Sequence, residues 1–315
     1  MTLIAKTVWL LILVALIVGV AIGYGISIPE KQALQSKLQG LEQASKQVSQ
    51  IQSELQKLSQ ENEQLKKQVS ELQKKLNPNY VENIKARGKL IVGTSADWPP
   101  FEYVNEKGQI VGIDIEIAKR IAKELGVELE IKDMKFAALI EALKNGLIDM
   151  ILADMTPTPE REQVVDFSIP YYFSKGNALI TLKGKEVKSV DELKGKRVGV
   201  QLGTIQEEWA KENLKDIAEV VSYDKVYPDM VMVLKRGDVD AIIVGDKMGS
   251  VLVERDSDLT IAMYVGGEQI GGAVAIPQGA EDLKFVVNKV IDELMTSGEL
   301  KKIFDNKIAE WLGIS

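Results

Sequence analysis

The sequence contains neither cysteine nor histidine in its 315 residues. Without cysteine it has no disulfide framework, no thiol nucleophile, no cysteine-ligated metal and no lipidated cysteine anchor. Without histidine, the Ser-His and Cys-His catalytic pairs, the usual zinc sites and the usual general base near neutral pH are also excluded. These absences favour a protein that is not an enzyme and that carries no cofactor or metal.

Basic residues are fewer than acidic ones in most of the chain. The first 80 residues hold 9 lysines against 6 acidic residues, but the rest holds 30 basic and 40 acidic ones, a balance of −10. An acidic domain without a basic stripe is a poor nucleic-acid binder, so nucleic acid is not an expected partner. With 45% apolar and 27% charged residues, the chain has the composition of a globular protein with room for more than one domain.

One long uncharged stretch covers residues 7–28, near the N-terminus. Its 22 mostly aliphatic residues are enough to cross about 30 Å of hydrocarbon as one helix. Lys6 precedes it, which predicts a short cytoplasmic N-terminus and an extracytoplasmic remainder. We therefore predict a membrane anchor over residues 1–29. The alternative is secretion after cleavage of a signal peptide near small residues such as Ala21, although this apolar core is longer than is usual for one.

Residues 30–79 are rich in Gln, Lys, Glu, Ser and Leu and follow a heptad repeat. Asn62 at an a position would fix the register and favour a parallel pair, whereas Ile51 at a d position is typical of higher-order assemblies. We predict a coiled-coil stalk that associates with copies of itself, with a lone solvated helix as the alternative. The a positions are Leu34, Leu41, Val48, Leu55, Asn62, Val69 and Leu76, and the d positions are Lys37, Ala44, Ile51, Leu58, Leu65 and Leu72.

From Leu90 onward, short aliphatic runs alternate with segments of helical period, a pattern typical of βαβ units and a parallel sheet. One set of units ends near residue 152, and a second runs from Arg197 to Val244. Two crossings between the sets would form a hinge. We predict an α/β fold with two lobes joined by two strands. Lobe 1 would cover residues 80–179 and, after a return, 271–315, and lobe 2 would cover residues 180–270.

The loops after two of these strands carry groups suited to a carboxylate. The run from Ala153 to Arg161 contains a Thr-Pro helix start, at which Thr158 can cap and Pro159 can open a helix. A guanidinium pairs with both oxygens of a carboxylate, and helix-start amides add partial positive charge. In the second set, Thr204 has capping-box spacing to the glutamate three residues later, so another helix start is expected in the same crevice.

Several blocks resemble the solute-binding proteins of ABC transporters for polar amino acids, from about Tyr80 to the C-terminus. The order and spacing of the blocks match that family, which implies a two-lobed binding protein of the periplasmic type that closes on an L-α-amino acid, such as glutamine or arginine, and delivers it to an ABC permease. The blocks are Gly93 to Tyr103, Gly112 to Ala118, Phe136 to Leu143, Met155 to Arg161 and Val165 to Ser168.

The resemblance also implies roles for single residues. Arg161, with the amides of Thr156 and Ile205, would bind the α-carboxylate, while the Thr156 hydroxyl and the backbone of Ala153 and Asp154 would meet the α-ammonium. Trp98 and Phe136 would enclose the ligand's side chain. The full predicted set is Ser95, Trp98, Phe136, Ala153, Asp154, Thr156, Arg161, Gln201, Thr204, Ile205 and Asp246, in which Ser95 and Gln201 read the side-chain tip.

The sequence departs from the family pattern at two acidic positions. Gly245 stands where the resembled proteins carry the aspartate for the α-ammonium, and Asp246 follows one step later. Asp246 would either reach the amine or cap the next helix. Asp154 stands where a small residue is usual, so its carboxylate would recognise a cationic tail, repel an acidic one or lie outside the cleft.

Two other functions stay open from the sequence alone. Some lyases that act on small carboxylates share this scaffold, but they need a proton-transfer group, for which only Asp154, Asp246 or a lysine remains. A ligand-sensing subunit of a signalling complex is the other alternative, in which a partner protein would supply the output.

Overall fold

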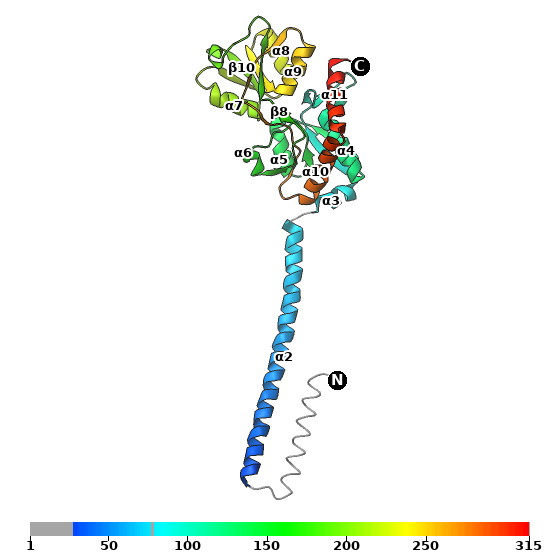
Figure 1. Ribbon diagram of the computed structural model, residues 1–315, viewed down its shortest axis with the longest axis vertical. Coiled ribbons are helices and arrows are strands. Elements are labelled where there is room, and N and C mark those ends of the chain that lie inside the picture. The colour runs from blue at the N-terminus through cyan, green and yellow to red at the C-terminus, as the bar shows by residue number, and fades with distance from the viewer. Residues whose placement is uncertain (1–27, 77–78, 315) are drawn as a thin grey trace. The chain divides into compact units, whose positions relative to one another are not determined.

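The computed structural model describes residues 28–76 and 79–314, without the side chains of residues 69–76 (Figure 1). These residues form two compact units that divide after Leu76. The predicted membrane span at residues 7–28 lies outside the described residues, apart from Ile28. Among the residues described, no helix is both long enough and apolar enough to cross a bilayer.

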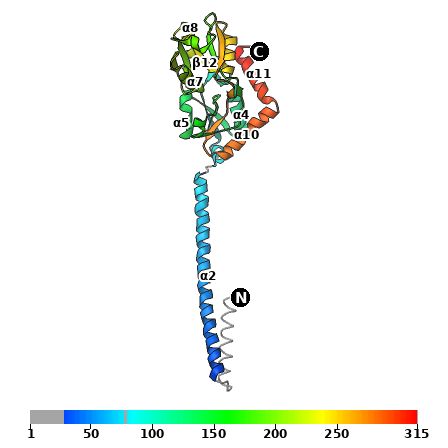
Figure 2. The same cartoon turned by 60° about the vertical axis from the view of Figure 1, so that its left-hand side comes forward.

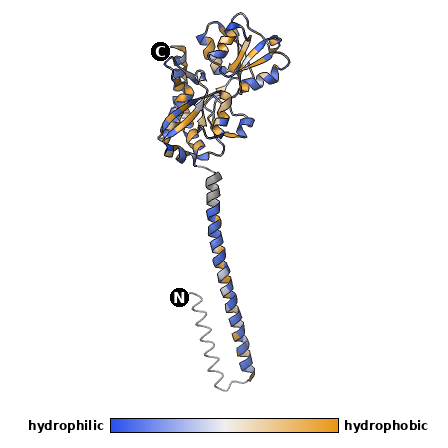
Figure 3. Ribbon diagram, turned by 180° about the vertical axis from the view of Figure 1, so that it is seen from behind, coloured by the Kyte–Doolittle hydropathy of each residue, from blue (hydrophilic) through white to orange (hydrophobic). Residues whose placement is uncertain are grey.

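The first unit consists of α2 (Ile28–Leu76), one helix of 49 residues. It is hydrophilic along most of its length, with apolar residues at intervals (Figure 3). Many of these apolar side chains hold the predicted a and d positions and are exposed to solvent, including Leu41, Val48, Ile51, Leu55 and Leu58. A coiled coil buries such a row against another helix. The helix is as expected, and its self-association stays a prediction.

Lobe 1 of the second unit is built on a five-stranded mixed sheet with the order β5-β1-β6-β15-β7. β1 pairs in parallel with β5 and β6, and β15 pairs antiparallel with β6 and β7. A small sheet, β2-β3-β4, precedes α4. The elements are α3 (Tyr80–Arg87), β1 (Lys89–Thr94), β2 (Asp97–Trp98), β3 (Glu102–Val104), β4 (Ile110–Val111), α4 (Ile113–Leu125), β5 (Glu128–Asp133), η1 (Phe136–Ala138), α5 (Leu139–Lys144), β6 (Met150–Ile151), α6 (Pro159–Glu162) and β7 (Val165–Phe167).

Lobe 2 is built on a second five-stranded mixed sheet, with the order β11-β10-β12-β9-β13. β10 pairs in parallel with β11 and β12, while β9 runs antiparallel to β12 and β13. β9 already begins at Asn177, three residues before the expected start of lobe 2. The elements are β9 (Asn177–Leu182), η2 (Val190–Leu193), β10 (Arg197–Gln201), α7 (Ile205–Asn213), β11 (Glu219–Tyr223), α8 (Asp229–Arg236), β12 (Ala241–Gly245), α9 (Asp246–Arg255) and β13 (Leu259–Val265).

The chain crosses between the lobes twice, through β8 (Phe173–Ser174) and β14 (Gln269–Ile270), which pair antiparallel. Gly176 has a φ of 122°, in the region that favours glycine. Gly272 is needed for a steric reason, because a Cβ there would lie 2.6 Å from the Tyr171 hydroxyl. The hinge therefore contains one glycine with a positive φ, Gly176, and one glycine, Gly272, that has no room for a side chain beside Tyr171.

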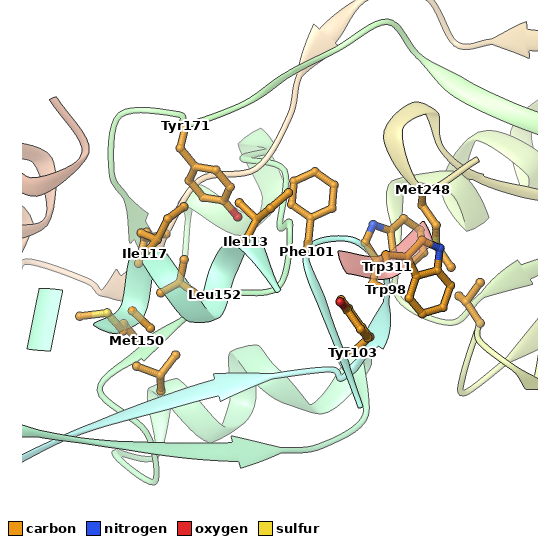
Figure 4. Packing of buried hydrophobic residues seen from close by; sticks show 14 of the residues in the cluster. Trp98, Phe101, Tyr103, Ile113, Ile117, Met150, Leu152, Tyr171, Met248 and Trp311 are labelled. Atoms are coloured by element: carbon orange, nitrogen blue, oxygen red, sulfur yellow. The ribbon is translucent and has the colours of Figure 1, made fainter. Parts of the chain in front are cut away.

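After the second crossing, β15 (Ala275–Pro277), α10 (Glu281–Thr296) and α11 (Glu299–Leu312) complete the unit. Helices α10 and α11 pack on α4 of lobe 1, and α11 also contacts α9 of lobe 2 (Figure 2). One apolar cluster continues from lobe 1 into lobe 2, and Trp98, Met248 and Trp311 lie together in it (Figure 4). The predicted α/β fold with two lobes and a two-strand hinge is confirmed.

Candidate functional site

A cavity lies between the two lobes. Ten of the eleven predicted site residues line it, the exception being Ser95. Parallel strands end at a common edge of each sheet, so the loops that follow them face the same crevice. The lining residues are Trp98, Phe136, Ala153, Asp154, Thr156, Arg161, Tyr172, Ser174, Gln201, Thr204, Ile205, Gln206, Gly245, Asp246, Gln269 and Gly271.

Arg161 is the cation of this cavity. It lies on α6, where the Thr158 hydroxyl accepts from the Arg161 backbone N–H at 3.3 Å and Pro159 opens the helix, as the sequence predicts. Its guanidinium donates to the Thr156 carbonyl at 2.7 Å and, across the cavity, to the Gly203 carbonyl at 3.0 Å. Burial lowers the pKa of Arg161. No ion pair holds it within the described chain, so a buried positive charge faces the cavity without a carboxylate partner.

The start of α7 faces Arg161 from lobe 2. Thr204 Oγ1 accepts from the Glu207 N–H at 3.2 Å, and Glu207 Oε2 accepts from the Gly203 N–H at 2.7 Å. The capping box thus forms, with the glutamate bonded one residue earlier than the usual N-cap amide. The first amides of a helix have no partner inside it, so the Ile205 end presents donors and partial positive charge to the cavity.

Two aromatic side chains of lobe 1, Trp98 and Phe136, line the cavity. The Arg161 guanidinium lies 5.5 Å from the centre of the Phe136 ring. Trp98 is 6% exposed and donates its indole N–H to Asp154 Oδ2 at 3.1 Å. Each ring also belongs to a buried apolar cluster, so each one both packs in the core and lines the cavity.

Asp154 adjoins a group of buried acids. Its backbone N–H donates to Asp114 Oδ2 at 2.8 Å, which the Tyr171 hydroxyl also reaches at 2.9 Å. Burial raises the pKa of Asp114 to about 6, and it raises the pKa of Glu102 well above its usual value. Burial, followed by the charge of Asp114, likewise raises the pKa of Asp154 well above its usual value. The lobe 1 side of the cavity is therefore backed by carboxyl groups that are costly to ionise.

Asp246 is the first residue of α9, and Gly245 holds the cap position. Its carboxylate accepts from the Tyr172 hydroxyl at 2.6 Å, the Ser174 hydroxyl at 2.9 Å and the Lys175 N–H at 3.0 Å. Asp246 thus lines the cavity while its oxygens hold the segment that crosses between the lobes.

Ser95 does not line the cavity and is connected to a lining residue only through Asp97. Its hydroxyl donates to Asp97 Oδ1 at 2.8 Å. Asp97 Oδ2 in turn accepts from Gln201 Nε2 at 3.1 Å and from the Val226 N–H at 2.7 Å, both of lobe 2. Burial raises the pKa of Asp97 to about 6 against the opposing effect of these hydrogen bonds. Ser95 and Gln201 are thus connected through an inter-lobe carboxyl that the sequence did not single out.

Sequence reasoning missed five further side chains and glycines of the lining, which are Tyr172, Ser174, Gln206, Gln269 and Gly271. Four of them lie in or next to the crossing strands. These four residues adjoin the predicted hinge, which was the signal that could have identified them. Gln206 is the second residue of α7, where its neighbour Ile205 was the predicted contact.

No group of three or more metal-ligating side chains occurs in the part of the chain that the structure describes.

Comparison with known proteins gives this cavity a context. Residues 90–310 match the model of the bacterial extracellular solute-binding proteins, family 3. The arginine-binding extracellular protein ArtP of Bacillus subtilis is 41% identical over 217 residues, which cover 68% of this chain and 84% of ArtP. The L-cystine-binding protein TcyJ of Escherichia coli is 36% identical over 238 residues, which cover 74% of this chain and 86% of TcyJ.

A solved structure has the same architecture. The amino acid ABC transporter substrate-binding protein AbpA of Streptococcus pneumoniae, bound to L-arginine, superposes with a TM-score of 0.69 and 40% identity, over 73% of this chain and 99% of AbpA. The matched region holds both lobes and the cavity between them. The chain therefore belongs to the bacterial extracellular solute-binding proteins, family 3.

Proposed function

We propose that this protein is the extracytoplasmic substrate-binding component of an ABC transporter and that it encloses an L-α-amino acid between its two lobes. The observation that carries the proposal is Arg161, a guanidinium only 7% exposed that faces a cavity with no ion pair among the described residues. Leaving a charge buried and unpaired is costly, so a ligand carboxylate is the expected partner. The opposed start of α7 adds donors on the other side of the same carboxylate.

The ligand class follows from the remaining lining. Asp154 and Asp246 add negative charge around a cavity that holds one cation, which disfavours an acidic side chain. Trp98 offers an aromatic face that attracts a guanidinium and also packs on a neutral side chain. An arginine-binding relative and an arginine-bound structure support a basic ligand. We place basic amino acids first and neutral polar ones such as glutamine second.

Nine of the eleven predicted residues would divide into a carboxylate end and a side-chain end. Arg161, Thr156, Thr204 and Ile205 would bind the carboxylate, and Ala153 would offer backbone groups near it. Trp98, Phe136 and Gln201 would surround the side chain, and Ser95 would act on Gln201 through Asp97. We propose binding without catalysis, because the cavity lining includes no histidine, the usual proton-transfer group near neutral pH.

The N-terminal segments would tether the binding unit. We propose that residues 7–28 anchor the chain in the membrane, with a short cytoplasmic N-terminus, and that α2 associates with copies of itself along its exposed heptad row. The mass of the mature N-terminus would test the anchor, since cleavage removes it. Sedimentation of residues 28–76 would test the pairing, because a monomer at all concentrations contradicts it.

Isothermal titration calorimetry against the twenty amino acids tests the binding proposal. We expect micromolar or tighter binding of one or a few amino acids to the intact chain, and its loss in Arg161→Ala. Arg236→Ala is the matched control, because Arg236 is an exposed arginine of lobe 2 that pairs with Asp238. If no amino acid binds the native protein, the proposed function is wrong.

A further inference from the structure

Two carboxylates of the described residues line the cavity, and they differ in how far their oxygens are already engaged. Asp246, from lobe 2, accepts three hydrogen bonds, and all three donors belong to the crossing segment from Tyr172 to Lys175. Both of its oxygens have donors. Asp246 is therefore committed to holding the hinge.

Asp154, from lobe 1, keeps acceptor capacity. Oδ2 receives one hydrogen bond, from the Trp98 indole at 3.1 Å, and the Gly272 backbone N–H is the other donor to the carboxylate. An ionised carboxylate offers about four acceptor positions. So few donors leave a buried carboxylate costly to ionise, unless a cation joins it.

The opposite wall comes close to this carboxylate at Gly245. A Cβ built on Gly245 would lie 3.9 Å from Asp154 Oδ2 and 3.3 Å from Trp98 Cζ2. The φ of Gly245 is −60°, so its backbone conformation does not require glycine. The absence of a side chain lets the lobe 2 backbone approach Asp154 and Trp98 closely, since even a Cβ would be in tight contact with the Trp98 ring.

The position of the proposed ligand carboxylate determines where the ligand's ammonium group lies. Arg161 donates to the carbonyl of Thr156, two residues beyond Asp154, and all three residues line the cavity. In an α-amino acid, the ammonium nitrogen is two bonds from the carboxylate carbon. A ligand held by Arg161 therefore carries its ammonium close to its carboxylate end, on the Asp154 side of the cavity.

We propose that Asp154 is the counter-ion of the ligand's α-ammonium group and that Asp246 is not. This inference rests on the proposed function. It assigns the recognition of the amine to lobe 1, next to the recognition of the carboxylate.

The electrostatic surroundings agree with this assignment. Burial and the neighbouring charges of Asp114 and Asp246 raise the pKa of Asp154 well above its usual value. Glu102, Tyr171 and Tyr172 also interact electrostatically with it. A bound ammonium would supply the one positive neighbour that this group lacks.

The test compares L-arginine with 5-guanidinopentanoate, which is arginine without its α-amino group. Asp154→Asn removes the charge, while asparagine tolerates the φ of 44° at this position and still accepts from the Trp98 indole. By calorimetry, we expect the Kd for arginine to rise about 100-fold in this variant. The Kd for the desamino compound should change by no more than about twofold.

Two further variants sharpen the result. Asp246→Asn should affect both compounds to the same extent, because it acts through the hinge. In the double variant Asp154→Asn/Gly245→Asp, a carboxylate returns from the other lobe, and arginine affinity should recover by about tenfold or more. Asp305→Asn, an exposed carboxylate paired with Lys301 on α11, controls for the change in net charge.

Three outcomes would overturn the inference while leaving the proposed function intact. These are unchanged arginine affinity in Asp154→Asn, equal losses of affinity for arginine and for its desamino analogue, and a loss in Asp246→Asn that is selective for arginine. If the native protein binds a different amino acid, that amino acid and its own desamino analogue replace the pair. Absence of any binding by the native protein contradicts the proposed function instead.

Discussion

The two walls of the cavity differ in chemistry. Lobe 1 contributes the guanidinium of Arg161, the carboxylate of Asp154 and the rings of Trp98 and Phe136. Lobe 2 contributes a helix start at Thr204 and the amide of Gln201, and its one acid, Asp246, is bonded to the hinge. Strong, charge-bearing contacts thus gather on lobe 1, whereas lobe 2 offers neutral donors. The difference suggests that lobe 1 selects the ligand and lobe 2 covers it.

The largest expected effect comes from removing the charge of lobe 1. Arg161→Ala should weaken amino acid binding by about 100- to 1,000-fold, since truncating one partner of a buried charge pair costs several kcal/mol. Calorimetry measures this loss, with Arg236→Ala as the control. A loss below about tenfold would mean that lobe 1 does not dominate binding.

The second prediction concerns the buried acids of lobe 1. The folded-state pKa of Asp114 is raised to about 6 by burial, so folding strengthens its hold on a proton. Its contribution to stability is therefore greatest below about pH 4 and is lost as the pH rises through about 6. From pH 7 to pH 4, the wild type should gain about 2 kcal/mol relative to Asp114→Asn.

Urea unfolding at a series of pH values measures this difference. Asp305→Asn is the control for the loss of one exposed carboxylate. A difference between wild type and Asp114→Asn that does not vary with pH would show that the raised pKa of Asp114 has no part in folding.

The third prediction concerns the helix start of lobe 2. Thr204→Ala removes the cap of α7 and the hydrogen bond that Thr204 donates to the Gln201 carbonyl at 2.7 Å. We expect a loss of about 1 kcal/mol of stability and about five- to tenfold of affinity. Thr158→Ala is the matched change at the α6 cap in lobe 1. Urea unfolding and calorimetry report the two losses, and a 100-fold loss of affinity in Thr204→Ala would place the main contacts on lobe 2.

The smallest effect is expected at the cavity's rim, where Lys135 of lobe 1 lies 2.6 Å from Asp224 of lobe 2. Both side chains are largely exposed, so the pair is screened by water and salt. Lys135→Ala should change affinity by no more than about threefold. A larger change that persists at 1 M salt would show that this ion pair, rather than the buried cavity, holds the lobes together.

Local patterns predicted much of this molecule. The aliphatic runs and helix-period segments located most strands and helices of both lobes, and the Thr-Pro and Thr-x-x-Glu starts located α6 and α7, because caps and periodicity act within a few residues. The contacts that unite the lobes could not be found in this way. Asp97 meets Gln201 and Val226 more than 100 residues away along the chain, and no short-range pattern carries such a pairing.

The sequence also could not show which acidic residues are buried or which donors surround them. From the sequence, Asp246 was expected to reach the amine or cap a helix, and Asp154 to meet a cationic tail, repel an acidic one or lie outside the cleft, whereas the hydrogen-bond donors around each carboxylate are visible only in the structure. Burial could not be deduced either, since aspartate is usually exposed and Asp114 is fully buried here. The heptad row of α2 was readable, but a pattern on one helix does not specify the number of its partners.

Trp311, near the end of α11, touches both halves of the binding unit. Its ring lies 4.8 Å from the Tyr103 ring of lobe 1, 4.8 Å from the Tyr227 ring of lobe 2 and 4.2 Å from the Arg255 guanidinium, measured between centroids or to the Cζ atom. Any relative rotation of the lobes must change the surroundings of this indole. The protein therefore carries an intrinsic fluorophore at a moving joint, and its emission can follow opening and closing without an attached dye.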